Sequence, residues 1–365
     1  MSEHTPLSGV SAKAGALFCN EAGWLMPAHY GDPDSEYRQA CDHAALFDIS
    51  HQGKVELTGR DACKFLHNLC TNDIKGLAIG AGCEAFLTTA QARVIARILI
   101  YHHGLNNGMN ALWLDVGAAM AEKVIKHLDH YLIREQIELA DRTGEFAQMH
   151  LAGPEAKAVL ETALFGDFPE LAELHHVERT TSDGAIAHIR RHAPLALPGY
   201  DIVCLNHVAE GIWQALTNAG ARPGGLQAYE TLRVEGGAPV NGLDIDETNL
   251  APEVGRTDRA ISYTKGCYLG QEPVVRIRDL GHVNRSLLGL RLSGSKALPR
   301  GTKLFHHGKE AGYVTSSVMS PRLGTAIALA YIRRGSHEPG TMVEVEADGY
   351  RLAAEVASLP FIHAS

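Results

Sequence analysis

Residues 265–272 have the sequence KGCYLGQE, and this octet is the strongest single indication of the fold. Its glycines, Gly266 and Gly270, allow left-handed backbone conformations and a close approach to another group. Cys267 lies two residues from Lys265, whose charge would favour the thiolate form of the cysteine. The octet is therefore typical of a functional loop rather than of a strand or helix. A surface turn with an incidental thiol is the alternative.

The octet resembles the signature of the YgfZ-type branch of the glycine cleavage T-protein family, which also contains folate-dependent aminomethyltransferases. Four further segments resemble that family: residues 23–31 (GWLMPAHYG), 46–54 (LFDISHQGK), 230–237 (ETLRVEGG) and 312–317 (GYVTSS). YgfZ-type proteins are linked to iron–sulfur protein maturation and to a tRNA thiomethylation step. The resemblance covers nearly the whole chain and implies a three-domain cloverleaf around a central folate-binding opening.

The composition is that of an acidic globular protein of more than one domain. The 365 residues exceed what one hydrophobic core usually organises. A net charge of −9 argues against general nucleic-acid binding. No apolar run approaches the roughly 20 residues that span a bilayer, and the first residues have no signal-peptide core. We therefore expect a cytoplasmic protein that contacts neither membrane nor nucleic acid.

Cysteines and histidines give no pattern typical of a metal site. The seven cysteines include no CxxC pair, which fits a reducing compartment with mostly buried thiols. Three histidine doublets lie in predicted turns, and His188 and His192 are four residues apart in a predicted strand. That spacing brings ligands together on a helix but not on a strand. We expect no metal site.

The first two thirds of the chain contain a weak internal repeat. Residues 54–66 align with residues 148–160, and each segment predicts a strand, a glycine turn and a helix. A predicted hairpin and a second helix follow each segment. The pattern therefore predicts two β-α-β-β-α modules, which arose by duplication or by convergence on a common unit.

The pattern changes near residue 280, where short β-rich runs separated by turns predict a small antiparallel barrel. These runs are residues 287–292, 303–305, 312–316, 327–332, 342–346 and 352–356. The predicted fold class is therefore α+β, with duplicated modules and a C-terminal β-barrel. We expect an N-terminal folate-binding module at 1–145, a second module ending in the octet at 146–279, and the barrel at 280–365.

The resemblance implies a site for tetrahydrofolate or a derivative. Arg233 and Glu235 lie in a motif that lines the folate opening in relatives, and Tyr30 matches a position near the ligand. Arg97 lies on a strand face that could meet an anion or only water. A buried ion pair for Arg233 and Glu235, and core packing for Tyr30, are the alternatives.

Two departures from the aminomethyltransferases concern their chemistry. Ala96 and Arg97 stand where those enzymes carry two adjacent aspartates, the first of which is the essential acid, and alanine cannot transfer a proton. Strand alternation places Ala96 on the core face with Val94 and Ile98. Leu197 stands where relatives carry the glutamate that grips the pterin. Both changes argue against glycine cleavage and weaken the expectation of tight folate binding.

The octet contains the remaining candidate catalytic residues. Cys267, assisted by Lys265, could act as a nucleophile or as a transient ligand for a soft metal. Gln271 and Glu272 could hold the loop or position a reacting group. One thiolate cannot hold an iron–sulfur cluster, since such clusters normally take four ligands.

Three functions are therefore considered from the sequence. The leading hypothesis is a folate-binding YgfZ-type accessory protein for iron–sulfur protein maturation or repair, with a link to tRNA modification and with iron–sulfur proteins as clients. The alternative is a folate-dependent aminomethyltransferase or demethylase, and the third is a scaffold without chemistry. We expect a monomer, because the barrel has no obvious pairing edge.

Overall fold

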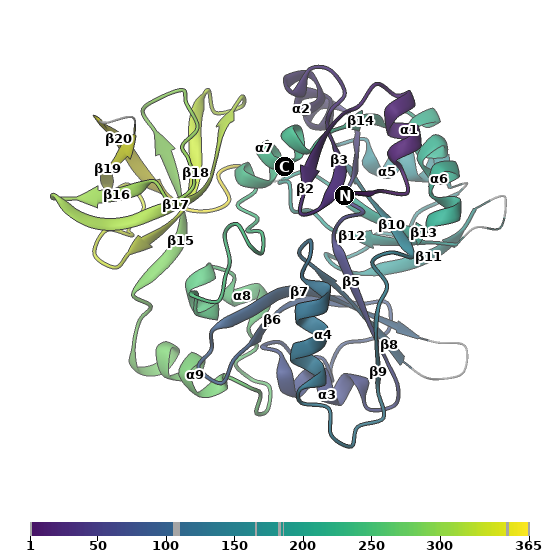
Figure 1. The fold of residues 1–365 in the computed structure, drawn as a ribbon, viewed down its shortest axis with the longest axis horizontal. Coiled ribbons are helices and arrows are strands. Elements are labelled where there is room, and N and C mark those ends of the chain that lie inside the picture. The colour runs from purple at the N-terminus through teal and green to yellow at the C-terminus, as the bar shows by residue number, and fades with distance from the viewer. Residues whose placement is uncertain are drawn as a thin grey trace.

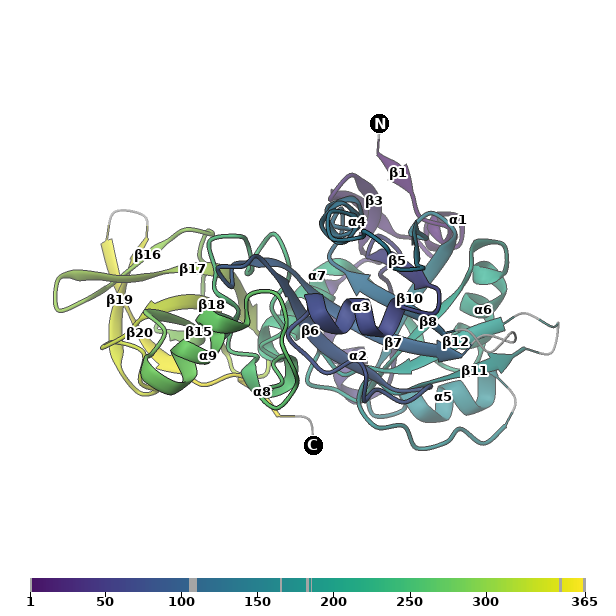
Figure 2. The ribbon, with the colours of Figure 1, turned by 90° about the horizontal axis from the view of Figure 1, so that it is seen from below.

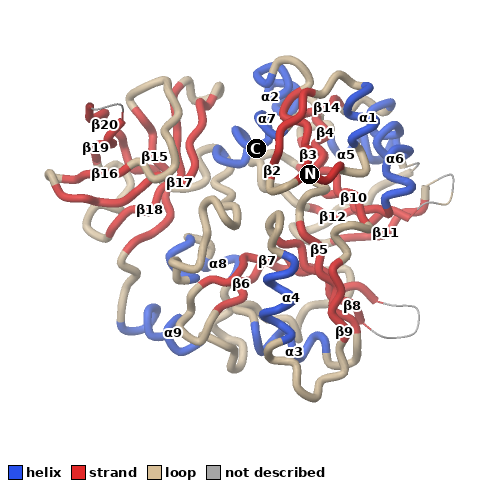
Figure 3. Tube along the Cα trace, viewed as in Figure 1, coloured by secondary structure: helices blue, strands red, loops and turns tan. Residues whose placement is uncertain are grey.

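A computed structural model describes residues 2–104, 110–164, 166–181, 184, 186–347 and 350–363 of the chain. It confirms the α+β class, with two α/β lobes and a separate all-β lobe arranged around the middle of the molecule (Figure 1). Strands form the centre of each lobe and helices cover the outer faces of the first two (Figure 3). No helix among these residues is long and apolar enough to cross a membrane.

The first lobe is built on a five-stranded sheet with the order β6-β7-β8-β5-β9. Its strands are β5 (Gly53–Thr58), β6 (Gly82–Thr88), β7 (Val94–Gly104), β8 (Asn110–Val116) and β9 (Glu138–Asp141). The helices α3 (Ala62–Leu69) and α4 (Ala121–Asp129) cover one face of this sheet. Each helix buries its apolar stripe, which on α3 consists of Ala62, Phe65, Leu66 and Leu69 as predicted.

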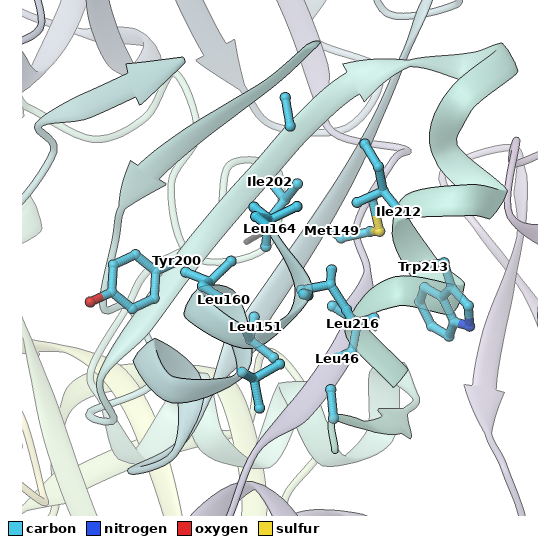
Figure 4. Close-up of a cluster of buried hydrophobic side chains, with 14 of the residues drawn as sticks. Leu46, Met149, Leu151, Leu160, Leu164, Tyr200, Ile202, Ile212, Trp213 and Leu216 are labelled. Carbon is cyan, nitrogen blue, oxygen red and sulfur yellow. The ribbon is translucent and has the colours of Figure 1, made fainter. Parts of the chain in front are cut away.

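The second lobe has a six-stranded sheet with the order β11-β12-β13-β10-β4-β14. Its strands are β4 (Ala45–Asp48), β10 (Phe146–Ala152), β11 (His176–Thr180), β12 (Ile186–Arg191), β13 (Gly199–Leu205) and β14 (Arg222–Gly224). The helices α5 (Ala156–Ala163) and α6 (Asn206–Asn218) cover it. Figure 4 shows the core between sheet and helices, which includes Met149 and Ile202 of the strands and Leu160 and Trp213 of the helices.

The two sheets share one strand order, which agrees with the repeat in the sequence. The order β6-β7-β8-β5-β9 corresponds to β11-β12-β13-β10-β4. The sequence missed the strands β6 and β11, which precede the hairpin in each unit. It also missed that β4, from the N-terminal part of the chain, completes the second sheet by pairing with β10.

An N-terminal segment and a linking segment frame the centre of the molecule. The N-terminal elements are β1 (Glu3–His4), α1 (Ser8–Lys13), β2 (Leu17–Glu21), β3 (Trp24–His29) and α2 (Pro33–Asp42), whose strands pair in the order β1-β3-β2. The linking elements are α7 (Leu226–Glu235), the 3-10 helix η1 (Ala251–Val254), α8 (Thr257–Ala260) and α9 (Gln271–Leu280).

The C-terminal lobe is the predicted antiparallel barrel, closed in the order β15-β18-β17-β16-β19-β20. Its strands are β15 (Arg285–Leu292), β16 (Lys303–His306), β17 (Lys309–Ser320), β18 (Thr325–Arg333), β19 (Met342–Ala347) and β20 (Tyr350–Ala357). All six predicted strands are confirmed. Figure 2 shows the barrel at one end of the molecule, with α8 and α9 beside it.

Candidate functional site

An inner cavity of about 100 Å³ lies where the two sheets meet α7 and residues 238–241. Its polar wall comes from both sheets and from α7. These polar residues are Gln52, Arg97, Asp115, Gln148, His192, Asp201, Tyr229, Arg233 and Asn241. Because the two sheets contribute side chains from β7, β8, β10 and β13, the cavity exists only when both lobes are folded together.

An outer cavity of about 600 Å³ adjoins the inner one. It is bounded by β2 and β3, by α7 and by β17 of the barrel, and its polar wall includes Glu21, His51 and Glu230. Gln52 and Tyr229 line both cavities, so they mark where the two spaces meet. The outer volume falls within the roughly 300–1,000 Å³ of small-molecule sites.

Two buried polar atoms at these walls have no hydrogen-bond partner among the described residues. They are Oε1 of Gln148 in the inner cavity and Nδ1 of His51 in the outer one. The Gln148 amide is fixed at its other end, where Nε2 donates to Asp115 at 3.1 Å. Burial lowers the pKa of His51 to about 3, so its imidazole is neutral at pH 7. Both atoms are therefore available to a ligand.

A buried carboxylate joins two histidines at the same wall. Asp201 accepts hydrogen bonds from Nδ1 of His150 at 2.6 Å and from Nδ1 of His192 at 2.8 Å. Burial favours the neutral acid, but the two imidazoles outweigh it and hold the pKa of Asp201 below its ordinary value. The bond to Asp201 fixes the tautomer of His192 and leaves its Nε2 without a partner among the described side chains.

A buried lysine shapes the loop that carries His51 and Gln52. The Nζ atom of Lys54 donates to the carbonyls of Ser50 at 3.1 Å and Gln52 at 2.8 Å. Burial lowers the pKa of Lys54 to about 8. The two hydrogen bonds from Lys54 hold residues 50–54 in a tight loop. This loop places the side chains of His51 and Gln52 at the cavity walls.

Arg97 lines the inner cavity, as the strand alternation implied, but it already has a partner. Its Nε donates to Glu84 at 2.6 Å, and Arg256 donates to both oxygens of the same carboxylate at 2.6 and 2.9 Å. Burial would raise the pKa of Glu84, but the two guanidinium groups outweigh it and hold that pKa far below the ordinary range. Of the two arginines, only Arg97 lines the cavity, and its Nε is already bonded to Glu84.

Arg233 also lines the inner cavity, and all five of its N–H donors are used within the protein. They bond Glu230, Asp244 at 2.6 Å, Ser316 of the barrel at 2.6 Å, and the carbonyl of Ala238. The predicted grip on a folate tail is therefore not available in this conformation. Arg233 instead ties α7 to the barrel and to the wall of the cavity.

Glu235 and Tyr30 are not among the residues that line the two cavities, and their predicted contact with a folate stays a prediction. Glu235 is fully buried and accepts hydrogen bonds from Tyr37, Ser320 and Arg322, which joins α7 to α2 and to the barrel. Residues 233 and 235 are two apart on a helix and so face different partners. Tyr30 packs against the core of the second lobe, and its hydroxyl donates to Ser11 at 3.0 Å.

Ala96 and Leu197, the two positions that differ from the aminomethyltransferases, are both buried among apolar residues. Ala96 is fully buried in the core of the first lobe with Ile98, as the alternation predicted. Leu197 packs in a core cluster with Phe47 and Leu232. Neither residue lines either cavity.

Lys265 of the octet is buried, and its ammonium group binds backbone carbonyls of the first lobe. Its Nζ donates to three carbonyls, those of His67 at 2.5 Å, Cys70 at 2.7 Å and Asn72 at 2.6 Å. These carbonyls lie at and beyond the C-terminal end of α3, where a positive charge is favourable. Burial lowers the pKa of Lys265. The expected pairing of Lys265 with the Cys267 thiol is not found, because all three ammonium donors are occupied.

The rest of the octet is fixed in place, with Cys267 exposed at the surface. Gly270 has a φ of +83°, and a Cβ there would lie 2.5 Å from the carbonyl oxygen of Thr89, so only glycine fits. Gln271 and Glu272 form the first turn of α9 rather than part of a loop. Cys267 is not among the residues that line the two cavities. Its proposed reactivity stays a prediction.

Most residues of the polar wall were not predicted from the sequence. Gln148 and His150 alternate with apolar residues on β10, a pattern that places two polar side chains on one buried face. That pattern could have been recognised. His192 and Asp201 have no such signal, because they are brought together by the antiparallel pairing of the hairpin β12–β13.

Comparisons with known proteins agree with this architecture. The GCVT N-terminal domain matches residues 7–265, and the glycine cleavage T-protein C-terminal barrel domain matches residues 285–363. An aminomethyltransferase of Rubrobacter xylanophilus is 32% identical, over 90% of this chain and 86% of the relative. An aminomethyltransferase of Geobacillus kaustophilus is 31% identical, over 99% of both chains. The glycine cleavage system aminomethyltransferase T from Bartonella henselae superposes with a TM-score of 0.90 at 25% identity, covering 100% of this chain and 99% of that one.

The names of these relatives support the aminomethyltransferase alternative better than the iron–sulfur accessory hypothesis, and they do not single out the YgfZ-type branch. The three-lobed fold, the cavities between the lobes and the two matching domains together assign the family. The chain belongs to the glycine cleavage T-protein family, whose members use tetrahydrofolate.

Proposed function

We propose that this protein binds a reduced folate at the two joined cavities and transfers a one-carbon unit between that folate and an amine. The observation that carries the proposal is the buried, unpartnered Oε1 of Gln148 on the cavity wall. A buried acceptor without a partner costs about 1–3 kcal/mol. A ligand donor at this position would remove that cost, and the edge of a pterin offers such donors.

The walls suggest which residues would hold each part of the reactants. Asp115 and Gln148 offer acceptors to a pterin edge, and Tyr229 offers a flat side to a ring. Glu21 and Glu230 place carboxylates in the outer cavity, and burial together with Glu230 raises the pKa of Glu21. Two carboxylates suit a cationic amine better than the carboxylates of a folate tail.

His192 is the candidate for proton transfer, in place of the acid missing at Ala96. A tetrahydrofolate held by Gln148 and Asp115 would supply the nitrogen that takes the one-carbon unit as the donor C–N bond breaks, and the proton released from that nitrogen would have to reach the departing amine. His192 would carry that proton on Nε2, and Asp201 would hold the imidazole in the required tautomer.

Calorimetry with tetrahydrofolate and a chromatographic assay across a panel of methylated and aminomethyl amines test the proposal. Gln148→Leu is expected to weaken folate binding about tenfold, because one hydrogen bond is lost. His192→Ala is expected to retain binding and to lower turnover by about 10²–10⁴-fold. Gln214→Ala, an exposed position on α6, should change neither. Absence of tetrahydrofolate binding by the wild type would overturn the proposal, and unchanged turnover in His192→Ala would remove the role of His192.

A second candidate is the iron–sulfur accessory role, which the octet favours. Cys267 is exposed on a segment held by the buried Lys265 and by Gly270, so a client protein could reach the thiol. The groups of described side chains that could hold a metal ion include no cysteine, so any contact of Cys267 with a cluster would be shared with a client.

Complementation separates the two candidates. The activity of a labile [4Fe–4S] enzyme would be measured in cells that lack this protein and carry the wild type, Cys267→Ala or His192→Ala. Rescue by the wild type and by His192→Ala, but not by Cys267→Ala, would support the accessory role. Equal rescue by all three would exclude a role of the thiol, and absence of any defect would leave the one-carbon transferase.

A further inference from the structure

We propose that His103, Glu178 and His188 form a binding site for a divalent cation, with Zn²⁺ as the best match, where the two sheets meet. Each residue offers one ligand atom, and the three atoms lie within 4.8 Å of one another. His103 comes from β7 of the first sheet, and the other two come from β11 and β12 of the second. This site is separate from the folate cavities, whose walls include none of the three residues.

Both histidines present a buried nitrogen that has no hydrogen-bond partner among the described residues. These atoms are Nε2 of His103, whose side chain is only 6% exposed, and Nδ1 of His188. Buried polar atoms in folded proteins are almost always paired. Two unpaired imidazole nitrogens beside one carboxylate therefore indicate a missing ligand that accepts nitrogen lone pairs, which is what a metal ion does.

The spacing of the ligand atoms fits a tetrahedral ion. Glu178 and His188 are directly opposite each other in the antiparallel pair β11–β12. Their Oε1 and Nδ1 atoms are 3.5 Å apart without forming a hydrogen bond. Metal–ligand distances of about 2.0–2.2 Å at a tetrahedral Zn²⁺ place two ligand atoms about 3.4 Å apart. The ligand atom of His103 lies within 4.8 Å of both.

The buried Arg190, on the same strand as His188, already has a carboxylate partner. It donates to both oxygens of Asp115 at 2.7 Å.

The donor set and its exposure indicate the kind of site. Two imidazoles and a carboxylate with a free fourth position are the ligand set of hydrolytic zinc sites, in which water or a small anion completes the coordination. The side chain of Glu178 is 58% exposed, so an ion can enter from solvent. The expectation of no metal site rested on spacing within single segments, whereas these ligands come from three strands of two sheets.

Zinc calorimetry on chelator-stripped protein at pH 7.5 tests the site. The wild type is expected to bind one Zn²⁺ per chain and to gain thermal stability on binding, since the ion binds only the folded state. Glu178→Ala is expected to lower the affinity by about tenfold or more, because even losses around the ligands cost about 10–100-fold. His188→Ala should do the same, whereas His175→Ala, an exposed neighbour in the chain, should bind as the wild type.

Glu178→Ala removes an exposed side chain and should leave the fold intact. It therefore tests the site even where His188→Ala fails to fold. Wild-type zinc affinity in Glu178→Ala would overturn the proposal. So would loss of zinc binding only in His192→Ala, because that result would assign the ion to the buried group of His150, His192 and Asp201.

Discussion

Two buried lysines of this protein donate hydrogen bonds to backbone carbonyls. Lys54 binds the carbonyls of its own loop, and Lys265 binds three carbonyls at the end of α3. Burial lowers the pKa of both. A lysine in a glycine-rich motif can therefore be structural, and its spacing from a cysteine does not make the two side chains partners.

The contrast between Lys265 and Cys267 gives a direct test. Lys265→Met should lower the free energy of unfolding by about 2–4 kcal/mol, because three buried carbonyls lose a charged donor. Cys267→Ala should change it by less than about 0.5 kcal/mol, because the thiol is exposed. Urea denaturation of both variants measures the difference, and equal stability of the two would contradict the assigned hydrogen bonds.

Ala96 offers a second test at this scale. Ala96→Asp restores the residue type of the aminomethyltransferases but places a carboxylate in a closed apolar core. We expect a loss of about 3 kcal/mol or more in the free energy of unfolding and no gain of turnover. A stable variant with increased transfer activity would show instead that this position opens to the folate.

At the scale of elements, the repeat is built on equivalent glycine turns. Gly59 follows β5 with a φ of +120°, and Gly153 follows β10 with a φ of +135°. A Cβ would lie 2.1 Å from the carbonyl oxygen of Gln136 at the first and 2.2 Å from that of His43 at the second. Both glycines therefore allow another backbone segment to pack against the strand–helix junction.

Substitution of these glycines should have the same effect in both lobes. Gly59→Ala and Gly153→Ala should each lower the free energy of unfolding by about 2 kcal/mol or more, because strain and a backbone clash are added. Gly144→Ala is the matched control, since nothing lies within 4 Å of its added Cβ. Thermal denaturation measures the stability of the three variants. If Gly153→Ala were as stable as the wild type, the two turns would not be equivalent.

At the scale of the whole molecule, the lobes are held by buried polar contacts that also build the site. Arg233 and Glu235 join α7 to the barrel, and Asp115 accepts hydrogen bonds from Arg190 and Gln148 of the other sheet. Of these residues, Arg233, Asp115 and Gln148 also line the inner cavity. The shape of this cavity therefore depends on how the two sheets pack against each other and against α7.

The histidines between the two sheets should make stability depend on pH. The pKa of His176 and of His188 is lowered to about 4, mainly by burial, from an ordinary value near 6.5. The unfolded chain therefore binds protons that the folded chain does not, so stability is full above about pH 6.5 and falls as the pH drops towards 4. Urea denaturation between pH 7.5 and 4.5, in a chelator, measures the fall.

A variant without the titrating group provides the control for this prediction. His188→Gln should reduce the fall, because glutamine takes up no proton over this range. His175→Gln should leave it unchanged, because His175 is exposed. An unreduced fall in His188→Gln would assign the acid sensitivity to other groups.

The sequence by itself determined the fold class, the six barrel strands, the repeat and the family, because these depend on local periodicity and on long motifs. It also determined that Ala96 belongs to a core, because alternation along a strand is a local property. Only the tertiary structure decided the partners of polar side chains. Lys265, Arg233 and Glu235 have partners up to 198 residues away, and His103 meets Glu178 and His188 across two sheets. Such pairings depend on how the lobes pack together, and no spacing along the chain encodes them.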